Sequence, residues 1–385
     1  MLASVEDVLL HLCTPADWRA ALTSGSVAPP SLEEVGFVHL STAEQVALPA
    51  ERLFHGRRDM VLLVVDRATL DRAGIDLRWE PGVPGDPESM RFPHAYGAVP
   101  ASAVLAVLPY RPDGEGRFAA PSVPEPDARN RAALSEPSLL RRAATEEIPV
   151  TGGVAVRTDA VPASRMHNQL LLEGAVDAAT VVAEADRTLD GLAHRAAVLY
   201  GEALAGAADD LRGRGWTVDE LRLMTAPAAR APGESAPGGS GPGGTGPSRV
   251  EDVDIEALRP QWDATWRRTV PGMPDGEIAQ LTDRYRIEEA VTRVLPLAVR
   301  DGATVVASCL LKIDGATAWL DLLETDPRHR GRGHGRALVE AARDRAAAAG
   351  CDLVALSTAA QGWPREWYAR CGFVEVGRCW VAARF

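Results

Sequence analysis

The sequence gathers arginine and glycine in one short stretch, residues 326–336, which spells DPRHRGRGHGR. Glycines let backbone N–H groups approach an anion closely, and a helix that follows adds its dipole and its unpaired N–H groups. Arginines supply the further donors and positive charge that a pyrophosphate group needs. We therefore expect a pyrophosphate site, the alternative being a tight glycine turn with solvated arginines. The residues expected to bind are Arg330, Gly331, Arg332, Gly333, His334, Gly335 and Arg336.

The elements expected around this stretch place it between a strand and a helix. Asp301-Gly302 and Asp314-Gly315 each predict a hairpin, and an Ala-rich helix after the stretch is closed by Gly350. This order of elements predicts an α/β fold for residues 249–385. The expected helices are 255–268, 275–291, 336–349 and one from Pro364 to Gly372; the expected strands are 295–300, 303–312, 316–324, 353–357, and an antiparallel pair, 373–376 and 380–385.

Two motifs in residues 249–385 resemble the GNAT superfamily of N-acetyltransferases. Arg330-x-x-Gly333-x-Gly335 is similar to that family's Arg/Gln-x-x-Gly-x-Gly/Ala loop, and residues 367–373, WYARCGF, resemble its Phe/Leu-Tyr-x-x-x-Gly-Phe corner. The resemblance implies a mixed central sheet that splays open and acetyl-CoA as co-substrate, without a metal. Carried over to this sequence, it implies that main-chain groups of Leu323 and Thr325 meet the pantetheine arm.

The same resemblance implies the residues that move protons. Tyr368 matches the tyrosine that often protonates the departing thiolate, which a phenol with a pKa near 10 can do at neutral pH. A carboxylate on the strand before the loop is expected to act as the base. Alternation puts Asp321 on the face of Leu323 and Thr325, and Glu324 on the other face unless the strand bulges. We prefer Asp321 and place Glu324 second; surface charges, or a Tyr368 that only packs, are the alternatives.

Residues 7–110 form a strand-rich α+β segment with its own histidines and aromatics. The fragments GFVHLS at 36–41, RWE at 78–80 and FPHAYG at 92–97 resemble the DUF952 family, whose fold is related to ADP-ribosyltransferases. By that analogy a pocket is expected, although each histidine could equally be a hydrogen-bonded core or rim residue. Metal binding is disfavoured because no HxH or HxxxH spacing occurs. The residues expected to line the pocket are His11, His39, Arg78, Glu80 and His94.

Composition suggests boundaries between three globular segments. A Gly/Pro-rich run at 227–248 predicts a flexible linker, and a Pro-rich run at 111–145 predicts a second one. The domains expected are therefore 1–110, 146–226 and 249–385. Residues 146–226 also show α/β patterning but no RxxGxG, and they resemble the extra half found in a GNAT subgroup. We interpret them as a degenerate GNAT-like half domain with a structural role.

Charge and cysteine content exclude several classes of protein. The net charge is −12, which argues against general nucleic-acid or membrane-surface binding. The five cysteines form no CxxC pair, so a disulfide framework or zinc site is not expected. Residues 1–12 lack the basic start of a signal peptide. We expect a cytoplasmic protein.

These observations lead to one preferred function and two alternatives. The preferred function is an N-acetyltransferase that moves an acetyl group from acetyl-CoA to a primary amine of a small molecule or peptide by direct attack. The first alternative is a non-catalytic acyl-CoA sensor. The second is a bifunctional protein with NAD or ADP-ribosyl chemistry in residues 1–110.

Overall fold

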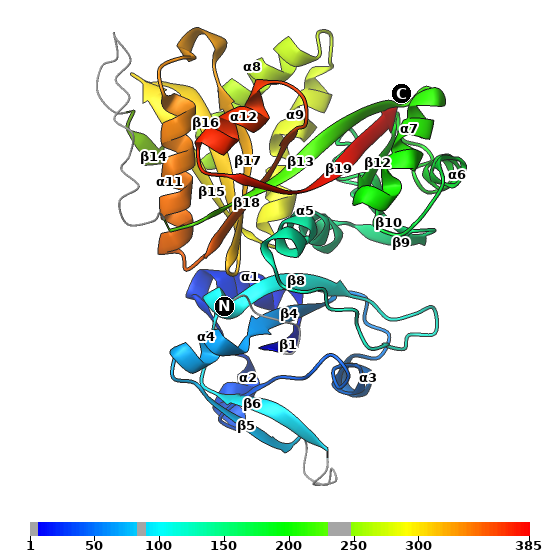
Figure 1. Cartoon of the computed structure of the whole chain (residues 1–385), viewed down its shortest axis with the longest axis vertical. Coiled ribbons are helices and arrows are strands. Elements are labelled where there is room, and N and C mark those ends of the chain that lie inside the picture. The colour runs from blue at the N-terminus through cyan, green and yellow to red at the C-terminus, as the bar shows by residue number, and fades with distance from the viewer. Residues whose placement is uncertain (1–6, 83–89, 230–247) are drawn as a thin grey trace.

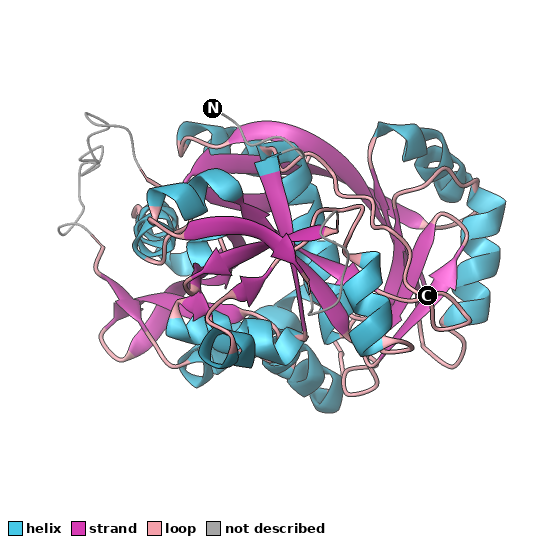
Figure 2. Ribbon diagram, turned by 90° about the horizontal axis from the view of Figure 1, so that it is seen from below, coloured by secondary structure: helices cyan, strands magenta, loops and turns pink. Residues whose placement is uncertain are grey.

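A computed structural model describes residues 7–82, 90–229 and 248–385. The N-terminal part ends with β8 (Val104–Tyr110) and lies beside a larger part built on one long sheet, with α5 (Ala128–Ala143) at the junction (Figure 1). Helices lie on both sides of the strands (Figure 2). The predicted α/β class is confirmed, with a large mixed sheet and a strand-rich N-terminal part.

The N-terminal part is built on an antiparallel sheet in the order β1-β4-β8. All residues of β4 are buried, and Trp18 of α1 is buried in the same core. Two smaller sheets, β3-β6-β5 and β2-β7, complete this part. Its other elements are β1 (Val8–Cys13), α1 (Pro15–Ser24), β2 (Ser26–Val27), α2 (Pro30–Glu34), β3 (Val38–His39), α3 (Ala47–Phe54), β4 (Met60–Asp66), α4 (Arg67–Arg72), β5 (Asp76–Pro81), β6 (Arg91–Tyr96) and β7 (Val99–Pro100).

The larger part contains an 11-stranded sheet in the order β14-β15-β16-β17-β18-β13-β19-β12-β11-β10-β9. Its strands are β9 (Glu146–Val150), β10 (Gly153–Arg157), β11 (Gln169–Leu172), β12 (Arg195–Tyr200), β13 (Thr217–Pro227), β14 (Val250–Asp252), β15 (Arg293–Asp301), β16 (Thr304–Asp314), β17 (Thr317–Thr325), β18 (Leu353–Ala359) and β19 (Val374–Arg384). Its helices besides α5 are α6 (Ala178–Thr188), α7 (Ala205–Gly213), α8 (Arg259–Thr269), α9 (Asp275–Asp283), α10 (Tyr285–Glu289), α11 (His334–Ala348) and α12 (Trp363–Arg370).

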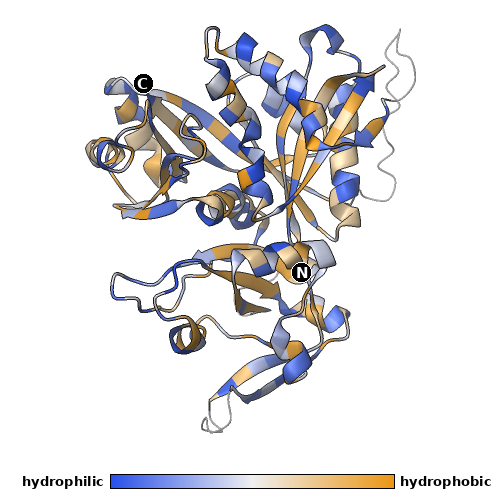
Figure 3. Ribbon diagram, turned by 180° about the vertical axis from the view of Figure 1, so that it is seen from behind, coloured by the Kyte–Doolittle hydropathy of each residue, from blue (hydrophilic) through white to orange (hydrophobic). Residues whose placement is uncertain are grey.

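The two faces of the sheet carry separate cores. Met224 of β13 packs in the core beneath α11 and α12, whereas its neighbour Leu223 packs in the core beneath α5. This is the alternation expected of a strand that is buried on both faces. Most of the sheet's strands are accordingly hydrophobic, and the helices that cover them carry both hydrophobic and hydrophilic residues (Figure 3).

The chain interleaves its segments within this sheet. All of β13 except Pro227 belongs to the segment 146–226. It nevertheless pairs with β18 on one side and with β19 on the other, and both of those strands belong to the segment 249–385. β12 also pairs with β19. The segments 146–226 and 249–385 therefore share one sheet. Of the predicted linker at 227–248, Pro227 ends β13 and Ala228 donates its backbone N–H to the Asp352 carbonyl, while residues 230–247 lie outside the described residues.

The structure corrects two sequence-based expectations. The segment 111–145 is not a linker throughout, because it contains the helix α5, which Asp127 caps by accepting the backbone N–H of Asn130 at 2.8 Å. The predicted pair 373–376 and 380–385 is a single strand, β19. Gly377 is not among the glycines with positive φ, so no turn forms there, and an irregular register opposite Leu223 and Met224 takes its place.

The N-terminal part docks on the hairpin between β16 and β17. The indole of Trp18 donates to the Asp314 carboxylate at 2.7 Å, and Arg142 of α5 pairs with the same carboxylate. Arg131, also on α5, donates to the Ala316 carbonyl at 2.9 Å. At the hairpin tip, Gly315 has a φ of 83° and a side chain there would come within 2.3 Å of the Val104 carbonyl oxygen. This junction is thus closely packed and well hydrogen-bonded.

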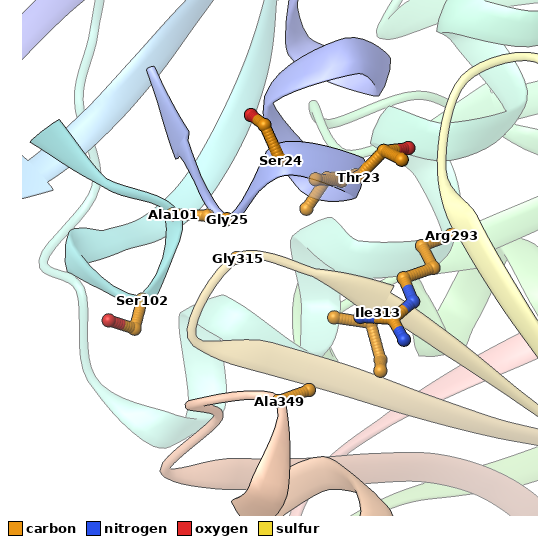
Figure 4. A pocket seen from close by; sticks show the side chains of 10 residues that line it. Thr23, Ser24, Gly25, Ala101, Ser102, Arg293, Ile313, Gly315 and Ala349 are labelled. Carbon is orange, nitrogen blue, oxygen red and sulfur yellow. The ribbon is translucent and has the colours of Figure 1, made fainter. Parts of the chain in front are cut away.

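A small cavity of about 160 Å³ remains at the same junction (Figure 4). Thr23 and Ser24 line it from the end of α1, and Arg293 and Ile313 line it from β15 and β16. None of the site residues expected from the sequence lines this cavity. It is a gap between two packed parts, away from the candidate chemistry.

Candidate active site

The strands β17 and β18 pair only at their first residues. Thr317, Ala318 and Trp319 lie opposite the stretch 353–355, and beyond them the two parallel strands separate. β17 remains paired with β16, and β18 with β13. The main-chain groups of β17 that face the opening have therefore lost their partner strand. Leu323 and Thr325 lie on this diverging part of β17.

The arginine- and glycine-rich stretch connects the end of β17 to the first turn of α11. Gly333 is the N-cap of α11 with a φ of 85°, and no side chain caps the helix. Arg330, Gly331, Arg332 and Gly333 are exposed. The N-terminal N–H groups of a helix of this length attract anions, and the flanking arginines add positive charge. The arrangement has the donors that the sequence predicted for a phosphate site.

The loop is held close to the diverging strands. Arg330 donates its Nε–H to the Thr325 carbonyl at 3.3 Å. A Cβ at Gly335 would lie 3.4 Å from the Trp367 ring and 3.8 Å from Leu323. The start of α11 is thus in contact with both β17 and α12. His334 hydrogen-bonds with the Ser248 hydroxyl at 2.8 Å, so this histidine is engaged at the edge of the loop.

β17 bulges immediately before the loop. Asp321 lies opposite Leu310 of β16, but Glu324 lies opposite Ser308, so three steps on β17 match two steps on β16. Leu322 sits at this irregularity with a φ of 50°, the left-handed region that non-glycine residues rarely adopt. The bulge moves Glu324 onto the face of Asp321. The expectation that Asp321 shares its face with Leu323 and Thr325 is therefore wrong, since Leu323 packs in the opposite core, beneath α11.

Asp321 is fixed in a buried ionic network. Its carboxylate accepts from Lys312 Nζ at 2.6 Å and from the Leu322 backbone N–H at 2.7 Å. Lys312 also pairs with Glu288 of α10 at 2.7 Å, and both side chains are nearly fully buried. The carboxylate of Asp321 thus stabilises the bulge and neutralises Lys312.

Glu324 has a different environment, between β17 and α8. Burial raises the pKa of its carboxyl group, while the Thr265 hydroxyl and Arg268 act in the opposite direction. Its Oε1 atom is buried and has no hydrogen-bond partner within the described residues. A carboxylate with a raised pKa and a free oxygen is suited to accept a proton.

Tyr368 lies on α12 and packs against the core beneath α11, as Leu323 does. Its ring packs edge-on against Trp367 and Phe373, at centroid distances of 4.9 and 5.7 Å. Burial raises the pKa of the phenol, and the nearby Cys309, Cys371 and Asp321 raise it further. The phenol therefore stays protonated over the physiological range, which a proton donor requires.

Several charged residues near Asp321 were not singled out from the sequence. Lys312 and Glu288 belong to the buried network, and His167 Nε2 lies 3.5 Å from Glu288. Burial, followed by repulsion from Asp321, raises the pKa of Glu136 on α5 to about 7. These residues come from distant parts of the chain, so no local spacing signals their cluster. The one signal in the sequence is Lys312, because a lysine within the apolar strand β16 needs a buried acidic partner.

The expected N-terminal pocket residues lie elsewhere. His39, His94, Arg78 and Glu80 are brought together on the small sheet β3-β6-β5. His11 is on β1 and donates its Nδ1–H to the His39 backbone carbonyl at 2.9 Å. It therefore helps to fix the position of β3 and does not itself lie on the small sheet. This group is separate from the loop at α11.

Three further expectations concern metals, membranes and cysteines. Across residues 7–82, 90–229 and 248–385, no group of three or more His, Cys, Asp or Glu side chains is arranged to hold a metal ion. In the same residues no helix combines the length and apolarity needed to cross a membrane. The five cysteines are all free thiols.

Two stretches of the chain are similar to known protein families. Residues 256–373 match the acetyltransferase (GNAT) family, and residues 12–107 match DUF952, a family of proteins of unknown function. No curated protein matches the chain.

Solved structures that resemble the chain cover different parts of it. A functionally unknown conserved protein from Staphylococcus epidermidis is 11% identical over 62% of this chain and 93% of its own, with a TM-score of 0.48. A GCN5-related N-acetyltransferase from Kribbella flavida is 17% identical over 66% of this chain and 95% of its own, with a TM-score of 0.43. Protein CC0527 from Caulobacter crescentus is 31% identical over 29% of this chain and 93% of its own, with a TM-score of 0.25.

Proposed function

Because residues 256–373 belong to the GNAT acetyltransferase family and residues 12–107 to the DUF952 family, we propose that the chain transfers an acetyl group from acetyl-CoA to a primary amine. The observation that best supports this is the opening between β17 and β18. The arginine- and glycine-rich loop leads from the end of β17 to α11, Glu324 lies on β17, and Tyr368 packs against the same core as Leu323. The acetyl donor is a substrate here, and the chain's own residues bind and orient it.

Binding of the donor falls to the loop and the diverging strand. The N–H groups at the start of α11 and the guanidinium groups of Arg330 and Arg332 bind the pyrophosphate. Main-chain groups of Leu323 and Thr325, which have no partner strand at the opening, bind the pantetheine arm. Holding the thioester in one position converts the transfer into an effectively intramolecular step.

Proton movement is assigned to Glu324 and Tyr368. The amine nitrogen forms a bond to the thioester carbonyl carbon, and the carbon–sulfur bond breaks. Glu324, directly or through water, takes the proton that the amine loses, since its pKa is raised and one oxygen is free. Tyr368 gives its proton to the departing thiolate. Asp321, which the sequence favoured as base, instead holds Lys312 and the bulge.

The test is turnover with a panel of primary amines, followed as release of free CoA thiol. We expect turnover of at least one amine, and Tyr368→Phe should lower kcat by about 100-fold, the scale of a lost proton donor. The KM for acetyl-CoA should change little. Calorimetric binding of acetyl-CoA without turnover of any amine would favour the sensor function, and no binding at all would refute both.

A further inference from the structure

The small sheet β3-β6-β5 presents a row of polar and aromatic side chains on one face. His39 lies opposite His94, and His94 lies opposite Arg78, so the three share a face across three strands. Their neighbours Val38 and Ala95 point the other way, into the hydrophobic core. The face that carries the histidines is therefore opposite to the one that Val38 and Ala95 bury in that core.

Glu80 fixes the hydrogen-bonding state of His94. Its Oε2 atom accepts the Tyr96 hydroxyl at 2.8 Å and the His94 Nδ1–H at 3.3 Å. With Nδ1 as the donor, Nε2 of the neutral ring is left as an acceptor. That Nε2 atom has no partner within the described residues, although His94 is only 1% exposed. A buried acceptor without a donor is unfavourable unless a ligand supplies the donor.

Aromatic rings pack against the His94 ring, and the guanidinium group of Arg78 lies on the neighbouring strand. Phe37 stacks on His94 at 4.0 Å, and the exposed ring of His39 stands edge-on to it at 5.1 Å. Arg78 lies 4.1 Å above the ring of Tyr96. Its ion pair is with Asp76, and both side chains are more than half exposed. Exposed ion pairs contribute little, so a ligand anion can take the place of Asp76.

We infer that this face of the β3-β6-β5 sheet binds a nucleotide. A ribose hydroxyl donates to His94 Nε2, a phosphate binds Arg78, and the base stacks on the exposed ring of His39. These three contacts match the three kinds of group that lie together on the face: a hydrogen-bond acceptor, a cation and an aromatic surface. The site lies at the far end of the molecule from α11, so it is distinct from the acetyl-CoA loop (Figure 1).

The inference does not depend on acetyl transfer, and its test is separate. Adenosine 5′-monophosphate, adenosine and ribose 5-phosphate are titrated into the full chain by calorimetry. Adenosine 5′-monophosphate should bind best because it alone carries all three groups. Arg78→Gln should weaken its binding by about tenfold, the effect of one lost charge-assisted contact, and leave adenosine unchanged. His94→Phe should weaken all three ligands.

Two controls locate the binding. Arg57→Gln removes another exposed arginine of the same domain, one that pairs with Asp59 at 2.7 Å, and should change nothing. The double variant Arg330→Gln/Arg332→Gln damages only the acetyl-CoA loop and should also leave the binding intact. Since Arg78 is exposed, its variant should keep the melting temperature of the wild type. The inference is overturned if the wild type binds no adenosine 5′-monophosphate at millimolar concentration, or if binding is lost in the loop variant but not in Arg78→Gln.

Discussion

The carboxylates of Asp321 and Glu324 lie on the same face of β17, although their spacing in a regular strand would put them on opposite faces. The left-handed Leu322 between them produces the bulge that causes this. The carboxylate of Asp321 accepts hydrogen bonds from Lys312 and from the Leu322 backbone N–H, whereas Glu324 has one carboxylate oxygen without a hydrogen-bond partner among the described residues. Of the two candidate bases, the structure therefore favours the one that the sequence placed second.

Glu324→Gln should remove the acidic limb of the pH profile of kcat/KM. The base must be deprotonated, so wild-type activity should fall as the pH drops through the raised pKa of Glu324. We expect the variant to lose about 100-fold or more in kcat/KM at pH 8. Asp321→Asn is the matched comparison: it should lower stability and keep the limb. A limb that disappears in Asp321→Asn but persists in Glu324→Gln would reverse the assignment.

Arg332→Gln should weaken acetyl-CoA binding without slowing the chemical step. A charge-assisted hydrogen bond to phosphate contributes about 1.5–3 kcal/mol, so KM for acetyl-CoA should rise about tenfold or more at unchanged kcat. Arg345→Gln provides the control, because Arg345 lies near the other end of α11 and pairs with Asp252 at 2.9 Å. Equal KM values for the two variants would contradict the phosphate role of Arg332.

Gly315→Ala should destabilise the junction between the N-terminal part and the large sheet. Alanine at a positive φ costs about 1–2 kcal/mol, and here its Cβ would also collide with the Val104 carbonyl. Gly302→Ala is a close control, since Gly302 has a φ of 59° but no atom within 4 Å of the added Cβ. Thermal unfolding and limited proteolysis should show a clearly larger loss for Gly315→Ala. Equal losses would mean that the contact with Val104 is not maintained.

Glu288→Gln should make the unfolding free energy depend less on pH in the acidic range. Burial alone would raise the pKa of Glu288, but the charges and hydrogen bonds of Lys312 and His167 together outweigh burial and lower it to about 2. A lowered folded-state pKa stabilises above the unfolded value near 4.5, and this stabilisation is lost as the pH falls toward 2. The difference corresponds to about 3 kcal/mol.

Urea unfolding from pH 7 to pH 3 measures this effect. The gap in unfolding free energy between wild type and Glu288→Gln should be largest at neutral pH and shrink below about pH 4.5. Glu375→Gln, a change at an exposed glutamate of β19, should run parallel to the wild type. A gap of constant size would show that the ionised form of Glu288 is not the stabilising species.

The sequence predicted those features that local residues determine. The hairpins at Asp301-Gly302 and Asp314-Gly315 and the helix after the arginine-rich stretch follow from turn and capping residues, and all are present. The helix α5 was missed because the prolines near it suggested a loop, yet its sixteen residues accommodate Pro137 within them. The capping role of Asp127 was the signal available there.

Long-range pairing left no such local mark. The bulge at Leu322 occurs at a leucine, where no glycine or asparagine announces a left-handed residue. The pairing of Lys312 with Glu288 depends on how α10 packs against α5 and β15. The position of β13 between β18 and β19 likewise depends on strands far along the chain. Periodicity can predict each strand, but not its neighbours.

The place of β13 has a consequence for how this chain can be made. β13 is synthesised well before β18 and β19. Both of its edges therefore stay unpaired until these last two strands have left the ribosome. Until then, a strand with unpaired N–H and C=O groups along both edges is open to association with other chains. A chain truncated before residue 353 should therefore aggregate, and residues 249–385 expressed alone would lack the strand that joins β18 to β19. We therefore expect that neither segment folds independently of the other.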